Sequence, residues 1–315
     1  MRRLLLPFVA LVALVTAPLA VYPAFLMHAL CMAIFASAFN LLLGYGGLLS
    51  FGHAAFFGWA AYAAAHGAKV WGWPPELALL AGLGTGAALG ASCGALAIRR
   101  KGISFAMITL ALAQMTYFIA LRAPFAHSED GIQNVPRGAL LGVIDLTHPA
   151  PMYYFVLAIY LVAQAGLFRI VYSPFGHVLR AIRENETRAI SMGYHAARCK
   201  WLAFVLSAAL SGLAGALNAL IFQSASLGGL DWHLSGEVVL MTLIGGVGSF
   251  FGPTIGAFVL VGLQDLLAGW SGWVSLLQGL AFVACVLSFR EGIAGALRKQ
   301  NSARRKERTE NLTLG

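Results

Sequence analysis

The sequence predicts an all-α integral membrane protein whose 315 residues form a single transmembrane domain over 1–315. Two observations lead to this prediction. Hydrophobic residues make up 59% of the chain and charged residues only 10%, whereas soluble domains carry about 25% charged residues. The mean hydropathy is accordingly high, at +0.78. The apolar residues also fall into runs whose lengths approach the roughly 20 residues that a helix needs to cross a bilayer.

Charged residues separate ten candidate spans. A cation at the centre of a bilayer costs about 2.5–3.5 kcal/mol, so the triplet Arg99-Arg100-Lys101 must end a span. Two of the spans are short enough to belong to broken helices. We expect the spans at residues 4–22, 23–43, 54–68, 76–98, 103–121, 151–171, 201–223, 236–249, 254–268 and 273–289.

The first span also resembles a signal peptide, because Arg2 and Arg3 precede an apolar run that ends in Ala17-Pro18-Leu19-Ala20. The run is longer than the usual core of a signal peptide and joins the next span through only Tyr22-Pro23. We therefore expect an uncleaved anchor. Cleavage would leave the remaining topology unchanged.

The distribution of basic residues predicts the orientation. With a cytoplasmic N-terminus and ten alternating spans, 18 of the 21 Lys and Arg residues lie in the cytoplasm, as the positive-inside rule requires. Both termini are then cytoplasmic, including a basic tail at 291–315 that lies near membrane lipid. The net charge of +9 thus reports topology, and we expect no binding of nucleic acid.

Two Gly-rich breaks, Gly46-Gly47-Leu48 and Gly228-Gly229-Leu230, each follow a span and face opposite sides of the membrane in this topology. Inverted repeats produce this pattern, since their broken helices meet near the membrane midplane. Spans two to five would match spans seven to ten. Between the repeats, residues 122–150 form an external loop, which is either a surface for a delivery protein or a solvated connection.

Residues 173–200 form a cytoplasmic segment with apolar residues at helical spacing between charged ones. This pattern predicts two short amphipathic helices, and Gly193 is suited to end one of them. A surface helix with an apolar strip indicates docking on another protein. The segment is therefore the candidate for contact with a cytoplasmic partner.

Three segments carry a resemblance to a known family. Residues 40–62 read Asn-Leu-Leu-Leu-Gly-Tyr-Gly-Gly-Leu-Leu-Ser-Phe-Gly-His-Ala-Ala-Phe-Phe-Gly-Trp-Ala-Ala-Tyr, and residues 241–253 read Met-Thr-Leu-Ile-Gly-Gly-Val-Gly-Ser-Phe-Phe-Gly-Pro. Both resemble signatures of branched-chain amino acid ABC transporter permeases of the LivM type. Residues 173–193 are similar to that family's coupling loop, the EAA loop. The resemblance implies a type II ABC importer-like permease fold.

The resemblance also implies a location in the bacterial inner membrane and a set of partners. These are a second related permease subunit in a heterodimer, two ATPase subunits that bind ATP and Mg, and a periplasmic substrate-binding protein. The chain itself has no Gly-x-x-x-x-Gly-Lys-Ser/Thr motif, so we expect a transport subunit that is not an enzyme and binds no cofactor. The residues expected in the ATPase coupling loop are Phe175, Gly176, Arg180, Arg183, Glu184, Glu186, Ala189 and Gly193.

Polar residues inside a bilayer are costly and usually line cavities or pair with one another. The residues expected along the translocation pathway are Asn40, Ser50, His53, Phe57, Tyr62 and Glu237. The alternative is that the polar groups fix the broken helices through interhelical hydrogen bonds and that the aromatic rings belong to the core. The four cysteines are far apart in the sequence, and no metal site is expected.

Other functions remain open at this point. Leu48 stands where many family members have Gln, which leaves urea, short amides or another small organic solute as possible cargo. An ion-coupled secondary carrier would need a titrating group within the membrane, for which Glu237 and Asp265 qualify. A membrane-embedded enzyme would need a clustered nucleophile, base or metal set, and the sequence has no such spacing.

Overall fold

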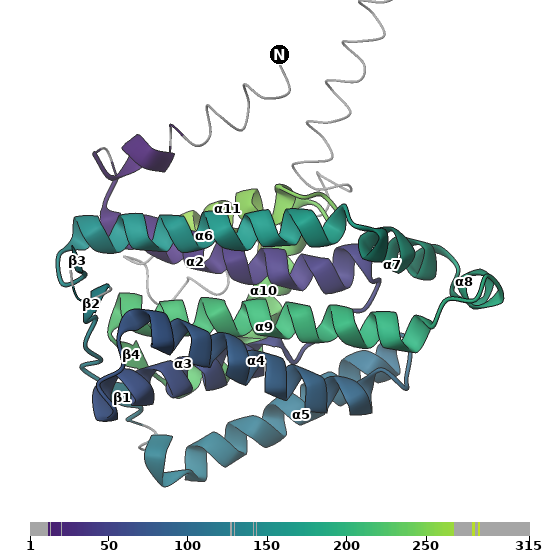
Figure 1. Cartoon of the computed structure of the whole chain (residues 1–315), viewed down its shortest axis with the longest axis horizontal. Helices are drawn as coiled ribbons and strands as arrows, with labels where there is room; N and C mark the ends of the chain where they lie inside the picture. The colour runs from purple at the N-terminus through teal and green to yellow at the C-terminus, as the bar shows by residue number, and fades with distance from the viewer. Residues whose placement is uncertain are drawn as a thin grey trace, which may run out of the picture.

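The computed structural model describes residues 12–267, apart from residues 13, 20, 127, 129, 141 and 143, together with residues 279, 280 and 283. The basic tail at 291–315 and most of the first and tenth predicted spans lie outside the described residues. Long helices lie side by side along the longest axis of the molecule (Figure 1). Short strands lie at one end of this bundle, and two short helices project from the other.

The helices are α2 (Pro23–Asn40), α3 (His53–Val70), α4 (Pro75–Ala97), α5 (Ile103–Arg122), α6 (Pro149–Val171), α7 (Pro174–Glu184), α8 (Glu186–Ser191), α9 (Ala196–Phe222), α10 (Trp232–Gly245) and α11 (Gly252–Leu267). A π-helical turn, η2 (Leu41–Tyr45), extends α2, and three 3-10 turns are η1 (Ala17–Leu19), η3 (Pro124–Ala126) and η4 (Leu227–Leu230). Five described helices are long and apolar enough to cross a membrane: Pro23–Tyr45, Pro75–Ala97, Ile103–Arg122, Pro149–Val171 and Ala196–Phe222. The predicted all-α membrane fold is confirmed.

Two helices, α9 and α10, begin several residues before the predicted spans, because their first turns contain polar residues. α10 begins at Trp232 instead of residue 236, because the Asp231 carboxylate accepts a hydrogen bond from the backbone N–H of His233 at 3.0 Å and caps the helix. α9 begins at Ala196 instead of residue 201. The last residues of the predicted 173–200 segment therefore belong to a membrane helix.

The two halves of the bundle exchange packing partners. α4, which follows α3, packs along α9, whereas α11, which follows α10, packs along α2. The equivalent helix of each half thus rests on the opposite half. This reciprocal arrangement is what an inverted repeat predicts.

Small residues allow α4 and α9 to approach each other closely. Gly82, Gly86, Gly90 and Gly94 recur every four residues along the buried face of α4. A Cβ atom on Gly86 would lie 2.4 Å from the carbonyl oxygen of Ala208 in α9, so a larger residue cannot occupy this position without displacing the helix. Such stripes of small residues are a principal means of helix association in membranes.

The loop between α5 and α6 is tied to the segment that follows α9. β1 (Ile132–Gln133) pairs antiparallel with β4 (Ser224–Ala225), and β2 (Ala139–Leu140) pairs with β3 (Ile144–Asp145). The Arg137 guanidinium donates hydrogen bonds to the carbonyl oxygens of Leu220 at 3.3 Å and Ile221 at 2.8 Å. These bonds satisfy carbonyls that the end of a helix otherwise leaves free.

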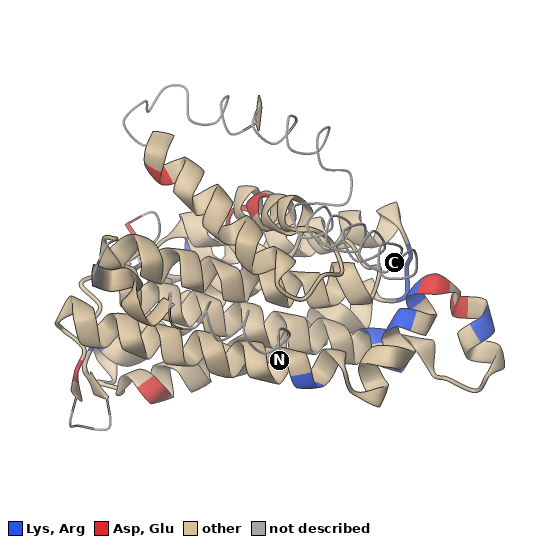
Figure 2. Ribbon diagram, turned by 90° about the horizontal axis from the view of Figure 1, so that it is seen from above, with Lys and Arg blue, Asp and Glu red and all other residues tan. Residues whose placement is uncertain are grey.

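Basic residues of the described chain gather at the α7–α8 end (Figure 2). Nine of the twelve described Lys and Arg residues belong to this end, namely Arg99, Arg100, Lys101, Arg169, Arg180, Arg183, Arg188, Arg198 and Lys200. Lys69, Arg122 and Arg137 belong to the strand end. The charge asymmetry predicted from the sequence is therefore present in the folded chain.

Candidate functional site

Residues 173–195, here called the hook, fold back from the end of α6 because of specific local residues. The Ser173 hydroxyl accepts a hydrogen bond from the backbone N–H of Gly176 at 3.4 Å and caps α7. A Cβ atom on Gly176 would lie 2.2 Å from the carbonyl oxygen of Val171, so the tight reversal requires glycine. The side-chain Oδ1 atom of Asn185 caps α8 by accepting a hydrogen bond from the backbone N–H of Arg188 at 3.0 Å.

Apolar side chains anchor the hook to the bundle. Leu179 is fully buried in a cluster with Leu41, Leu42 and Tyr45 at the end of α2, and Phe175 packs against this cluster. A second small cluster contains Ile182, Ala189 and Ala196. The apolar side of these two amphipathic helices therefore packs against the helix bundle of the same chain.

Two arginines of α7 reach back to the membrane helices. The Arg180 Nη2 atom donates a hydrogen bond to the Val171 carbonyl oxygen at 2.7 Å, and its guanidinium carbon lies 5.4 Å from the centre of the Tyr45 ring. Such a cation over an aromatic face is stabilising. Arg183 Nη1 donates to the carbonyl oxygen of Gly44, within the π-helical end of α2.

Glu186 joins the tip of the hook to two other elements. Its carboxylate lies 2.7 Å from Lys101 Nζ, in the loop before α5, and 2.9 Å from Lys200 Nζ in α9. The Lys200 side chain is only 9% exposed. Burial raises the pKa of Glu186, but the hydrogen bonds and charges of the two lysines outweigh burial and bring the pKa below its usual value.

The outer surface of the hook carries apolar side chains that are exposed. Ile190 is 54% exposed, Met192 58% and Tyr194 44%. Glu184 is exposed on the same segment. Gly193 has a φ of +89°, which favours glycine, and its position is open, with no atom within 4 Å of an added Cβ. Ile190 and Met192 belong to the apolar residues at helical spacing in the predicted segment, whereas Tyr194 follows the predicted helices and was missed.

Asn40 lies at the end of α2 and holds the turn between α10 and α11. Its Nδ2 atom donates to the Ser249 carbonyl oxygen at 2.9 Å, and its Oδ1 atom accepts from the Gly248 N–H at 2.9 Å. The residue is 3% exposed. Both ends of the amide are therefore used in contacts between the two halves of the fold.

His53 begins α3 and is fully buried. Its Nε2 atom lies 2.8 Å from the Ser207 hydroxyl, which itself donates to the Ala38 carbonyl oxygen at 2.6 Å. Because the single hydroxyl proton is used toward Ala38, Nε2 must carry the proton that joins His53 to Ser207. The Nδ1 atom is left without a partner within the described part of the chain.

Hydroxyl groups of two other helices hold the segment between the first break and α3, together with the first turn of α3. Ser235 of α10 accepts a hydrogen bond from the N–H of Ala54 at 2.9 Å, and Thr109 of α5 accepts from the N–H of Phe51 at 3.1 Å. Ser50, which is buried, accepts from the N–H of Gly52 at 3.2 Å. Sequence analysis did not place Thr109 or Ser235 among the site residues, although Ser235 belongs to the stretch that resembles the second signature.

Phe57 and Tyr62 are buried within the bundle. The Phe57 ring packs against Phe35 with ring centres 4.9 Å apart. Glu237 is half-buried on α10. Of the six residues expected along a pathway, all but Glu237 are buried in the described conformation.

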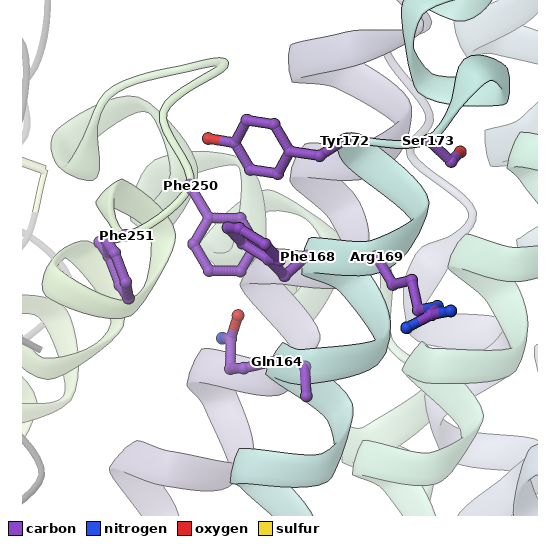
Figure 3. Close-up of a pocket in the computed structure, with 8 residues that line it drawn as sticks. Gln164, Phe168, Arg169, Tyr172, Ser173, Phe250 and Phe251 are labelled. Carbon is purple, nitrogen blue, oxygen red and sulfur yellow. The ribbon is translucent and has the colours of Figure 1, made fainter. Parts of the chain in front are cut away.

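Two apolar grooves lie close to these segments. One of about 520 Å³ is lined by residues of the first break and α5, with Trp232 of α10, including Leu48, Leu49, Phe51, Met107 and Leu110. Another of about 780 Å³ lies between α6 and the α10–α11 turn, where Phe168 and Tyr172 face Phe250 (Figure 3). No group of three or more potential metal-ligating side chains occurs within the described residues.

Comparisons with known proteins agree on one family. A family model described as the permease component of the branched-chain amino acid transport system matches residues 22–287. The high-affinity branched-chain amino acid transport system permease protein LivM of Escherichia coli is 26% identical over 290 residues, which cover 83% of this chain and 67% of that relative. No solved structure matches the chain.

Permeases with other named cargoes are also similar. The ribose import permease protein RbsC of Bacillus subtilis is 28% identical over 196 residues, or 57% of this chain and 58% of that relative. The autoinducer 2 import system permease protein LsrC of Klebsiella pneumoniae is 26% identical over 168 residues, or 50% of this chain and 46% of that relative. With the family match extending over residues 22–287, the chain belongs to the family of branched-chain amino acid transport system permease components, which are transport subunits and not enzymes.

Proposed function

We propose that this chain is the transmembrane permease subunit of an ABC importer that moves branched-chain or related amino acids, driven by ATP hydrolysis on separate subunits. The hook is the observation that supports this most directly. It is anchored on one side by Leu179 and Arg183, and its outer side presents Ile190, Met192 and Tyr194. An exposed apolar patch on a polar segment is typical of a protein docking surface.

In this proposal two ATPase subunits, which bind ATP and Mg, act on the complex, and one of them contacts the hook. A second related permease completes the pathway, and a periplasmic binding protein delivers the substrate. The α7–α8 end faces the cytoplasm of a bacterial cell, because most described basic residues lie there. Both termini lie on the same side in this topology.

Two observations favour an amino acid with an aliphatic side chain. The LivM relative matches 83% of this chain, whereas the ribose permease relative matches 57%. The groove beside the first break is lined mainly by apolar side chains such as Leu48, Leu49 and Met107. A sugar would leave most of its hydroxyl groups unpaired against such walls, which is costly. A permease for urea, short amides or another small solute is the alternative.

The test is transport by the complete complex in proteoliposomes. The tagged chain is purified with the polypeptides that remain bound, and uptake of labelled leucine is measured with ATP, without ATP, and with excess unlabelled valine, urea or ribose. The proposal expects ATP-dependent leucine uptake that valine suppresses and ribose does not. If urea or ribose suppressed leucine uptake and valine did not, the proposed substrate class would be wrong. Uptake that an uncoupler abolishes in the absence of any ATPase would instead indicate an ion-coupled carrier.

A further inference from the structure

We propose that Asn40 and Arg183 together form a latch that ties the hook to the Gly-rich turns of both halves, so that Asn40 is a positioning residue for coupling and not part of the pathway wall. The role of the latch in coupling ATP hydrolysis to transport rests on the proposed function. Its structural part, that the two side chains hold three segments together, is independent of the substrate.

The first part of the latch is the close approach of the α10–α11 turn to α2. A Cβ atom on Gly44 would lie 2.1 Å from Asn40 Oδ1 and 2.7 Å from the backbone nitrogen of Gly248. Only glycine therefore allows the turn to come this near. The Asn40 amide then bonds Gly248 and Ser249 with one group each.

The second part is Arg183, which enters the same niche from α7. Its guanidinium donates to the carbonyl oxygen of Gly44. A Cβ atom on Gly47 would lie 2.9 Å from Arg183 Cγ, and one on Gly248 would lie 3.5 Å from Arg183 Nη1. Gly47 and Gly248 have positive φ values of +68° and +77°. The glycines of both turns thus make room for one cationic side chain.

The chemistry of these contacts makes the latch stiff. A guanidinium that donates to carbonyl oxygens near the end of a helix is favoured by its charge and by the helix dipole. Arg183 and Asn40 share Gly44 and Gly248 as neighbours, so a shift of α7 moves the end of α2, and α2 moves the α10–α11 turn. The hook is therefore connected to the break in one half and to the turn in the other through two side chains.

The variants that test the latch are Asn40→Ala, the nearly isosteric Asn40→Asp, Arg183→Gln and Arg183→Lys. Lysine retains one donor for the Gly44 carbonyl and should restore part of the wild-type behaviour. Thr116→Val is the matched control, because Thr116 is buried and bonds only within its own helix, to Ala113 at 2.8 Å. Complexes with normal subunit recovery are compared, which removes variants that fail to fold.

Two readouts separate the latch from the proposed function. Spin labels at His177→Cys in α7 and Phe251→Cys in the turn, both exposed, report their distance distribution in lipid nanodiscs, with the four native cysteines replaced. ATP hydrolysed per leucine transported reports coupling. We expect Asn40→Ala and Arg183→Gln to broaden the distribution and raise the ratio by about five-fold or more, with Thr116→Val unchanged.

A distribution in Asn40→Ala and Arg183→Gln as narrow as that of the wild type overturns the latch. A broadened distribution with an unchanged ratio overturns its role in coupling. If the wild-type complex neither hydrolyses ATP nor moves leucine, the proposed function fails, while the distance distributions still decide whether the latch exists. The double variant Asn40→Ala/Arg183→Gln should raise the ratio of ATP hydrolysed to leucine transported by less than the combined effect of the two single variants, because both residues act on one connection.

Discussion

Asn40, Ser50 and His53 are polar side chains in apolar surroundings, and each finds its partner on the backbone or on a neighbouring helix. Asn40 bonds the α10–α11 turn, His53 bonds Ser207 of α9, and Ser50 bonds the backbone of Gly52 just before α3. A buried polar group without a partner costs about 1–3 kcal/mol. At the scale of the residue, hydrogen-bond satisfaction thus accounts for the positions of Asn40 and Ser50, whereas His53 uses Nε2 and leaves Nδ1 without a partner in the described part of the chain.

Glu186 provides a residue-scale prediction. Glu186→Gln removes the negative charge between Lys101 and Lys200 and leaves the buried Lys200 cation uncompensated. We expect amide hydrogen exchange in α8 at pH 7 to accelerate about tenfold, which corresponds to about 1.4 kcal/mol of lost local stability. Glu184→Gln, at an exposed position of the same segment, should leave the exchange of α8 unchanged.

The pH dependence of the same contact has a definite sign. The pKa of Glu186 in the folded chain lies below its ordinary value of 4.5, so the charged form favours the folded hook. This stabilisation is complete above pH 4.5 and is lost as the pH falls through the lower, folded-state pKa. Protection of α8 in the wild type should therefore persist to about pH 4.5 and then decline. Equal pH profiles for wild type and Glu186→Gln would refute the link.

At the scale of the element, two features decide how helices pack. The glycine stripe of α4 brings α9 within backbone contact, and the amphipathic pattern of the hook divides its residues between an anchored and an exposed side. In both cases the spacing of residue types along one helix determines which surface is buried. The consequences are separately testable.

Gly86 and Gly84 are a matched pair on α4. A Cβ atom on Gly86 would collide with the Ala208 carbonyl oxygen, whereas one on Gly84 would have no atom within 4 Å. Gly86→Leu should destabilise the purified protein by about 1–3 kcal/mol or more, because it overpacks the α4–α9 contact. Gly84→Leu should be neutral or slightly stabilising, since glycine is a poor helix former. Thermal unfolding in detergent measures both, and equal losses would contradict this packing.

Met192 tests the exposed side of the hook. Met192→Asp places a charge in the patch with Ile190 and Tyr194, and we expect recovery of the ATPase subunit with the purified chain to fall about tenfold, because truncating or charging a central apolar contact costs about 1–2 kcal/mol or more. Thr187→Asp adds the same charge at an exposed position in α8 of the hook and should retain the ATPase. Loss of the ATPase in both variants would show that charge, and not the patch, controls binding.

At the scale of the whole molecule, two features describe the bundle. Its halves exchange packing partners, and its basic residues gather at one end. α4 rests on α9 and α11 rests on α2, while most described cations lie at the α7–α8 end (Figure 2). In the proposed topology, the hook and the β-strands lie on opposite sides of the membrane. This separation fixes the expected topology.

Cysteine labelling in intact cells tests that topology. In a chain without native cysteines, Ser128→Cys in the loop between α5 and α6 should react with a membrane-impermeant maleimide added outside. Thr187→Cys in α8 should react only after the cells are permeabilised. Both positions are exposed in the structure, so accessibility depends on the side of the membrane. Labelling of Thr187→Cys in intact cells would reverse the orientation derived from the basic residues.

The sequence by itself determined the membrane class, most helix positions, the two helices of the hook and the family, because hydropathy, helical spacing and contiguous motifs are local properties of the chain. The first and tenth spans, which the same criteria predict, fall mostly outside the described residues. The early start of α10 was missed because the span criterion counts apolar residues and overlooks a cap such as Asp231.

Only the tertiary structure decided what the polar residues of the breaks contact. Asn40 and its partner Ser249 are 209 residues apart in the sequence, and Ala54 and its partner Ser235 are 181 apart. No local pattern identifies such pairs, so the sequence left pathway lining and interhelical bonding as alternatives for Asn40. Folding brings the α10–α11 turn against α2, and the directional requirements of the amide hydrogen bonds then specify the contact.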